Sequence, residues 1–199
     1  MKVFYGARLF DGEEMRDDCA LVIDGESIQA RVALKDRPRG GEQVDLGGGV
    51  LSPGFIDWQI NGGGGVLFNA NPTVEGIAAI GAAHRRAGVT AFLPTVVTDA
   101  PRVLTQALAA AREARERIPG ALGVHVEGPF IDSKRKGVHP PEFIRAMKEE
   151  DANALIAARA GVMVVTLAPA SVPLEFIGRL AKAGIIVSLG HSDASAEEA

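Results

Sequence analysis

The pattern of apolar positions changes near residue 50. Before that point the apolar runs are short. Residues 2–5 form one run, and residues 20–23 and 27–30 flank the turn Asp24-Gly25-Glu26, which is typical of a β-hairpin. Three successive glycines at 47–49 follow as a joint. We therefore predict a small N-terminal β domain over residues 1–50, with a β-sandwich architecture.

From residue 51 onward the chain alternates between short apolar runs and longer stretches with helical periodicity. Strands followed by helices predict a parallel sheet with helices outside it. The predicted strands are 55–60, 90–97, 122–127, 162–167 and 185–189, and the predicted helices are 71–88, 99–119, 142–160 and 174–183.

Two α/β folds share this alternation: an open doubly wound sheet and a (β/α)8 TIM-type barrel. No Gly-x-Gly-x-x-Gly or P-loop motif follows the first predicted strand. Polar side chains instead end several strands, as in barrel enzymes. We predict the barrel. Its eight units need roughly 200–250 residues, so residues 51–199 should hold about five units, and the capping-box pattern of Ser195 and Glu198 should begin a further helix.

Composition narrows the classes of function. The net charge of −4 gives no general attraction to nucleic acid, and Cys19, the only cysteine, rules out an internal disulfide. No apolar run approaches the ~18 residues of a membrane span, and the N-terminus does not resemble a signal peptide. We therefore expect a cytoplasmic enzyme that acts on neither nucleic acid nor membrane.

The run 122–127 carries the chemistry that is easiest to interpret. Alternation along a strand places His125 and Glu127 on one face, and a carboxylate at a buried strand end needs a compensating partner. His191 ends the fifth predicted strand and should meet Glu127 at the same mouth of the barrel. Carboxylate and imidazole ligands suit one Zn²⁺ or Fe²⁺ ion. The alternatives are a Glu127 satisfied by amides or a buried arginine, and a capping or core role for His191.

Other polar residues surround these two. Gln59 and Asn61 are expected to face the barrel interior, where their amides could hydrogen-bond a metal-bound water, a substrate carbonyl or a loop backbone. His139, in a loop above Glu127, can reach a substrate. His125 is expected to be a packing residue or to support the ligands from behind. We expect Trp58 to pack between the barrel and its helices. His84 is expected only to complement the dipole of its helix.

Four stretches, taken together and in this order, resemble the N-acetylglucosamine-6-phosphate deacetylases, a family within the amidohydrolase superfamily. They are PGFIDWQING (53–62), HVEGPF (125–130), KGVHP (136–140) and SLGHSD (188–193). The resemblance implies hydrolysis of the acetamide of N-acetylglucosamine 6-phosphate to glucosamine 6-phosphate and acetate, by a homodimer that takes this phosphorylated amino sugar as its partner.

The resemblance also implies roles for individual residues. Glu127 and His191 correspond to metal ligands. Gln59 and Asn61 mark a one-metal branch, in place of the His-x-His of related enzymes. The residues implied to contact the substrate are Val138, His139, Gly62 and Gly63. The general acid/base aspartate, a further metal-binding histidine and a phosphate-contacting arginine are all expected beyond Ala199, so the 199-residue chain would carry no catalytic residue and would be inactive alone.

Two alternatives remain at this stage. One is another amidohydrolase, such as a cyclic-amide hydrolase or a deaminase, which would use His-x-His and a carboxylated lysine; Lys148 and Lys182 are the candidates for the lysine. The other is a half-barrel that binds a partner without catalysis.

Overall fold

The computed structural model describes residues 1–198 and divides into two compact units, Met1–Gly54 and the remainder from Phe55. The first unit contains two small sheets, with strand orders β5-β4-β1-β6 and β3-β2-β7. Its buried apolar side chains are Val3, Leu9, Ala20 and Val22. The strands are β1 (Lys2–Tyr5), β2 (Arg8–Phe10), β3 (Met15–Arg16), β4 (Cys19–Asp24), β5 (Ser27–Ala33), β6 (Glu42–Asp45) and β7 (Val50–Leu51), and the 3-10 turn η1 covers Leu34–Asp36.

The predicted hairpin is confirmed in this unit. Strands β4 and β5 pair in antiparallel fashion, and Asp24 stands opposite Ser27. Gly25 has φ +57°, a left-handed conformation that glycine adopts without a steric penalty. The turn residues therefore set the pairing next to the turn, and the register shifts by one residue between Ile23 and Val22.

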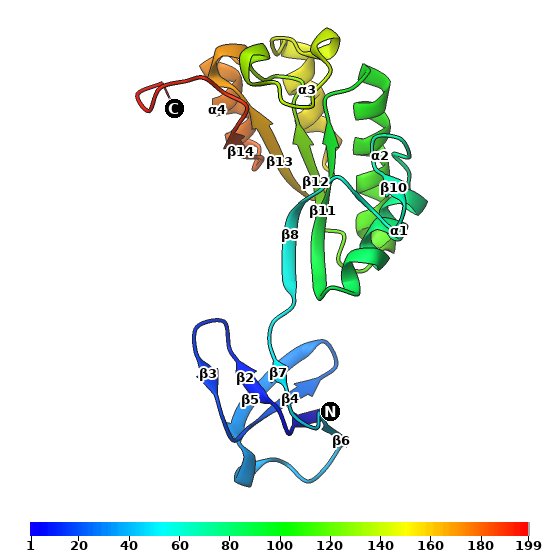
Figure 1. Cartoon of the computed structure of the whole chain (residues 1–199), viewed down its shortest axis with the longest axis vertical. Helices are drawn as coiled ribbons and strands as arrows, with labels where there is room; N and C mark the ends of the chain where they lie inside the picture. Colours follow the sequence, from blue (N-terminus) through cyan, green and yellow to red (C-terminus); the bar gives the residue numbers. More distant parts are fainter. Residues whose placement is uncertain (199) are drawn as a thin grey trace. The chain divides into compact units, whose positions relative to one another are not determined.

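The second unit is built on a five-stranded parallel sheet with the order β14-β13-β12-β11-β8 (Figure 1). Among these five strands, each is hydrogen-bonded to the one that follows it in sequence. A doubly wound sheet reverses its order at a switch point, whereas a barrel does not. The predicted α/β class and barrel-type order are thus confirmed. The strands are β8 (Phe55–Ile60), β11 (Val89–Val97), β12 (Gly123–Glu127), β13 (Val162–Leu167) and β14 (Ile186–Leu189).

The helices connect these strands and pack against the sheet; α1 and α2 lie beside β11 in Figure 1. Their buried side chains join those of the strands in one apolar cluster, in which Ile77, Ala111, Leu155 and Leu180 represent the four helices. Burying a large apolar side chain contributes about 1.5–3 kcal/mol, so this cluster holds the sheet in place. The helices are α1 (Val74–Arg85), α2 (Pro101–Arg117), α3 (Glu149–Ala158) and α4 (Leu174–Lys182).

Two predicted helix boundaries are wrong. The cap of α1 is Thr73, whose hydroxyl accepts a hydrogen bond from the Gly76 amide, and not Asn71. Helix α3 begins at Glu149 instead of residue 142. The reason is that the amides of Arg145 and Met147 donate to the carbonyls of Pro129 and Ser171. These tertiary hydrogen bonds replace the helical ones.

The reciprocal hydrogen bonds of the predicted capping box are present: the Ser195 amide donates to Glu198 Oε2 at 2.9 Å, and the Glu198 amide donates to Ser195 Oγ at 3.4 Å. Within residues 1–198, no helix has the length and apolar character needed to cross a membrane. The short elements are β9 (Gly62–Gly63), β10 (Val66–Leu67), η2 (Ser133–Arg135), η3 (Pro141–Phe143) and η4 (Pro169–Ser171).

Candidate metal centre

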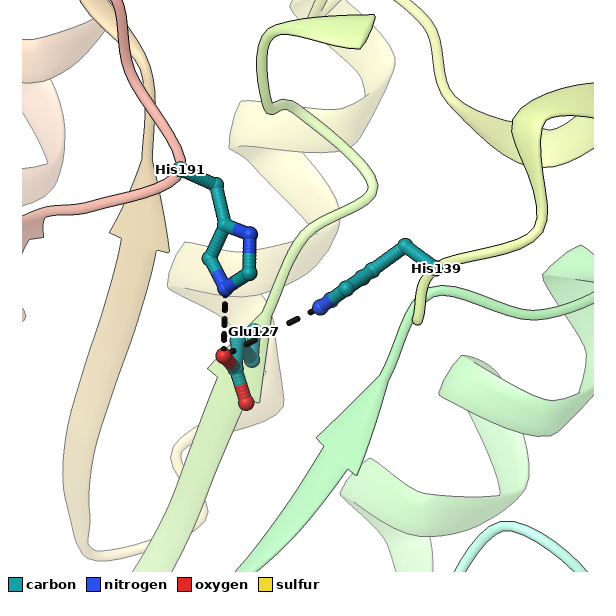
Figure 2. A group of neighbouring side chains, drawn as sticks. All are labelled: Glu127, His139 and His191. Atoms are coloured by element: carbon teal, nitrogen blue, oxygen red, sulfur yellow. Dashed lines mark hydrogen bonds and ion pairs between the residues drawn. The ribbon is translucent and has the colours of Figure 1, made fainter. Parts of the chain in front are cut away.

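Three side chains meet at the end of the central strand β12 (Figure 2). Glu127 is the last residue of β12, His139 lies in the loop after η2, and His191 follows β14. His191 Nε2 lies 2.9 Å from Glu127 Oε1, and His139 Nε2 lies 3.8 Å from the same oxygen. One nitrogen of each imidazole and one carboxylate oxygen all lie within 4.8 Å of one another. The predicted meeting of Glu127 with His191 is therefore present, with His139 beside them.

The far side of each imidazole is held by a protein oxygen. His191 Nδ1 lies 2.8 Å from the carbonyl oxygen of Arg135, and His139 Nδ1 lies 2.6 Å from the hydroxyl of Thr98. A carbonyl oxygen can only accept, so Nδ1 of His191 carries the proton of that hydrogen bond. A neutral His191 ring then presents the Nε2 lone pair to Glu127. Two acceptors 2.9 Å apart repel each other unless a proton or a metal ion lies between them.

The donor set fits one divalent ion. Zn²⁺ binds imidazole nitrogen and carboxylate oxygen at about 2.0–2.2 Å in tetrahedral geometry, so two ligand atoms of one ion lie roughly 3.4 Å apart. The distances from Glu127 Oε1 to the imidazoles, 2.9 Å to His191 and 3.8 Å to His139, lie on either side of that separation. When protons instead of an ion lie between these groups, hydrogen bonds and charge from the imidazoles, that of His139 first, lower the pKa of Glu127 to about 2 although burial opposes this shift. Glu127 is therefore a charged ligand at neutral pH.

Gln59 supports the carboxylate from the opposite side. Its Nε2 donates to Glu127 Oε2 at 3.0 Å, so both oxygens of Glu127 are engaged. Asn61 lies just beyond β8, and its backbone carbonyl accepts a hydrogen bond from the Phe68 amide at 2.8 Å. The structure thus brings Gln59 to the cluster, and it places Asn61 directly before the glycine-rich loop Gly62–Gly65.

The expected position of Trp58 is wrong. Its side chain is 53% exposed, and its ring stacks on His125 with centroids 6.0 Å apart and an interplanar angle of 5°. The register between β8 and β11 shifts between the pairs Asp57↔Phe92 and Ile60↔Pro94. Between these two pairs β8 contains one residue more than β11, as in a β-bulge. That irregularity breaks strict alternation, which is why neighbouring residues of β8 reach toward β12.

His125 is buried on the same face of β12 as Glu127, two residues earlier in the strand. Its Nδ1 lies 3.1 Å from the carbonyl oxygen of Trp58, and its Nε2 lies 2.7 Å from the hydroxyl of Thr166. Burial lowers the pKa of His125, although the charge of Glu127 opposes the shift. Both ring nitrogens are occupied by protein partners. This arrangement suits the supporting role that we expect for His125.

The glycine-rich loop is held by a residue whose role the sequence did not reveal. His84 on α1 lies with its Nε2 2.9 Å from the carbonyl oxygen of Gly62, so the expectation that it only complements the helix dipole is wrong. A Cβ atom on Gly63 would lie 2.8 Å from His84 Nε2, which explains the glycine there. Sequence could flag His84 only as a lone histidine on a helix.

Val138, which the resemblance implies to contact the substrate, is 89% exposed beside the buried His139.

Residues 50–174 match the sequence model of the amidohydrolase family. The chain belongs to this family. It is 39% identical to N-acetylgalactosamine-6-phosphate deacetylase of Shewanella sp. over 99% of the chain and 51% of that protein. Its fold is similar to that of N-acetylglucosamine-6-phosphate deacetylase from Pasteurella multocida, with a TM-score of 0.93 and 34% identity over 98% of the chain and 52% of that structure.

A further solved structure contains a ligand. It is a mutant of N-acetyl-D-glucosamine-6-phosphate deacetylase from Mycobacterium smegmatis in complex with N-acetyl-D-glucosamine-6-phosphate, with a TM-score of 0.83 and 29% identity over 98% of the chain and 51% of that structure. The resemblance inferred from the four sequence stretches is thereby confirmed. The chain spans about half the length of the curated relatives it matches.

Proposed function

We propose that the protein hydrolyses the acetamide of N-acetylglucosamine 6-phosphate, releasing acetate and glucosamine 6-phosphate. The observation that carries this proposal is the group Glu127, His139 and His191 at the carboxyl ends of parallel strands. The family supports a metal-dependent hydrolase, and the names of similar proteins support the sugar phosphate as substrate. The two compact units would be the small β domain and the barrel domain of this enzyme.

In the proposed centre, Glu127 and His191 hold one divalent ion, Zn²⁺ or Fe²⁺. An ion held there supplies Lewis acidity, because it polarises a carbonyl oxygen and lowers the pKa of a coordinated water. Gln59 fixes the orientation of the Glu127 carboxylate, and Thr98 and the Arg135 carbonyl fix the two imidazoles. Such supporting hydrogen bonds align ligands before any ion arrives.

Two alternative roles for His139 fit this proposal. Its Nε2 lies close enough to Glu127 to share an ion, and the same nitrogen can instead meet the acetamide carbonyl of a substrate. We assign it to the substrate, together with Val138 and the Gly62–Gly63 backbone, and we keep Glu127 and His191 as the metal ligands. Gln59 and Asn61 are amides where a second metal would need stronger donors, so one ion is proposed.

A second candidate substrate is N-acetylgalactosamine 6-phosphate. The 39% identical relative from Shewanella carries that name, and the acetamide and the phosphate are common to both sugars. A cyclic-amide hydrolase or deaminase using a carboxylated lysine receives less support. Lys148 precedes α3 and Lys182 ends α4, so neither lies on a strand of the sheet. Both side chains are exposed.

The proposal extends to the setting of the enzyme. We place the enzyme in the cytoplasm, because a phosphorylated sugar does not cross membranes freely and the free thiol of Cys19 fits a reducing compartment. We also propose that it is a homodimer, as the family resemblance implies. Sedimentation of the purified protein checks the dimer.

The decisive experiment measures acetate release by the native-length protein loaded with Zn²⁺ or Fe²⁺. We expect acetate from N-acetylglucosamine 6-phosphate, less from the galactosamine isomer, and none from unphosphorylated N-acetylglucosamine. A faster reaction with the galactosamine isomer would establish the second candidate instead. A metal-loaded protein that releases acetate from neither sugar phosphate would overturn the proposal.

A further inference from the structure

The loop after β12 and the turn after β14 hold each other through three contacts around His191. The Asp132 amide donates to the His191 carbonyl oxygen at 2.9 Å. The His191 ring donates from Nδ1 to the Arg135 carbonyl oxygen at 2.8 Å. The Arg135 guanidinium donates to Asp193 Oδ1 from Nε at 2.8 Å and from Nη2 at 2.5 Å. These contacts secure the backbone of His191, its ring, and the chain just after it.

His191 needs such support because of its backbone conformation. Its φ is +50°, and only two other non-glycine residues in the part of the chain that the structure describes, Asp18 and Arg159, have a positive φ. A side chain with a Cβ atom is strained in this region, and the strain persists only where the surroundings hold it. At His191 the surroundings are the loop 132–135 and the ion pair of Arg135 with Asp193.

The same loop also delivers His139. The His139 amide donates to the Lys136 carbonyl oxygen at 3.0 Å, so the loop turns back toward the sheet directly after η2. The rings of His139 and His191 then meet edge to face, with centroids 4.6 Å apart and planes at 61°. A displacement of the loop would therefore move both imidazoles of the cluster relative to Glu127.

We propose that Arg135 and Asp193 form a clasp that keeps His191 in its left-handed conformation and so sets how tightly the cluster holds its metal ion. The inference rests on the metal centre of the proposed function. Arg135 and Asp193 are positioning residues in this arrangement, because their charged groups bind each other and act on the ion only through His191.

The expected size of the effect follows from exposure. The side chains of Arg135 and Asp193 are 61% and 41% exposed, and an exposed ion pair changes an equilibrium by about two- to five-fold. Arg135→Ala should therefore weaken Zn²⁺ binding about two- to five-fold. Arg135→Asp adds repulsion with Asp193 and should weaken it about ten-fold.

The test compares Zn²⁺ dissociation constants, measured by competition with a chromogenic chelator, and the unfolding midpoints of the metal-free proteins. The variants are Arg135→Asp, Asp193→Arg and the double variant that exchanges the two charges. The matched control is Lys134→Asp, which makes the same change of charge one residue earlier. Lys134 is exposed, and within residues 1–198 its side chain makes no hydrogen bond or ion pair, so its charge acts on Asp193 only at a distance. The control therefore separates this long-range effect of charge from the direct contact of Arg135 with Asp193.

Each single reversal should weaken Zn²⁺ binding about ten-fold, and the exchanged pair should return it to within about two-fold of the wild type. The control should change it less than two-fold, and the midpoints of all variants should match that of the control. The clasp is overturned if the exchanged pair fails to restore binding, or if Lys134→Asp weakens it as much as Arg135→Asp. A wild-type protein that binds no Zn²⁺ would overturn the metal centre of the proposed function and the clasp with it.

Discussion

Strands β12 and β8 support the same carboxylate from two sides, and they do so in different ways. All five residues of β12 are buried, and the strand has a paired neighbour on each side. Strand β8 is last in the order of the sheet, and Phe55, Ile56 and Trp58 in it are each more than half exposed. Within residues 1–198, β12 is thus paired on both sides, whereas β8 pairs with β11 alone.

The registers of the two strands show the consequence. Strand β12 pairs with β13 residue for residue, from Gly123↔Val162 to Glu127↔Thr166, whereas the pairing of β8 with β11 shifts twice. Glu127 therefore points where strict alternation predicts, and Gln59 reaches it from an irregular strand. The comparison predicts that changes in β12 have large effects and changes in β8 have smaller ones.

The largest effect is expected at the start of β12. A Cβ atom on Gly123 would lie 1.9 Å from the Val162 carbonyl oxygen, a backbone atom that cannot rotate away. Gly123→Ala should lower the free energy of unfolding by about 3 kcal/mol, the upper end of the usual cost of overpacking. Urea denaturation measures it. Gly178→Ala is the control, because a Cβ there meets no atom within 4 Å and alanine favours a helix. Equal midpoints for the two variants would contradict the rigid pairing of β12 with β13.

The next effect concerns the charge at the end of β12. Glu127→Gln keeps the shape of the side chain and removes the negative charge that faces both imidazoles. We expect Zn²⁺ affinity to fall by about 100-fold or more, since loss of a ligand should exceed the 10- to 100-fold loss typical of its supporting residues. Metal content after dialysis checks this result. Glu142→Gln, at an exposed position in η3, should retain the metal. Full occupancy in Glu127→Gln would show that the carboxylate is structural.

A smaller effect is expected on the β8 side of the same carboxylate. Gln59→Ala removes the hydrogen bond to Glu127 Oε2 and leaves the charge in place. Zn²⁺ affinity should fall about ten-fold, the lower end of the range for supporting residues. Gln106→Ala, an exposed change on α2, serves as the control in the same chelator competition. A loss as large as that of Glu127→Gln would mean that β8 and β12 contribute equally, against the comparison.

The smallest effect is expected at Trp58, which stacks on His125 but remains half exposed. Trp58→Leu should lower the free energy of unfolding by about 0.5–1 kcal/mol, the size of an aromatic contact. Circular dichroism must follow the unfolding, because Trp58 is the only tryptophan and its replacement removes that fluorescence. Trp58→Phe keeps an aromatic ring and should recover part of the loss. A cost above about 3 kcal/mol would place Trp58 in the core.

The strands of the second unit and the position of Glu127 could be predicted because their signals are local. Apolar runs of strand length locate β12 and β13, and alternation within β12 puts His125 and Glu127 on one face. The barrel was favoured over the doubly wound sheet because polar residues end several of these strands, as in barrel enzymes. The start of α3 was missed because Arg145 and Met147 bond to segments far away in the chain, and local pattern carries no trace of those partners.

The sequence by itself determined the α/β class, the hairpin at Gly25, and the candidacy of Glu127 and His191, because side-chain periodicity and turn chemistry act within a few residues. Only the tertiary structure decided that His139 comes within ligand distance of Glu127, that Trp58 lies on His125, and that His84 holds Gly62. These contacts depend on where a loop, an irregular strand and a helix end meet in space. Segments distant in sequence are brought together by packing of the whole unit, which no local pattern records.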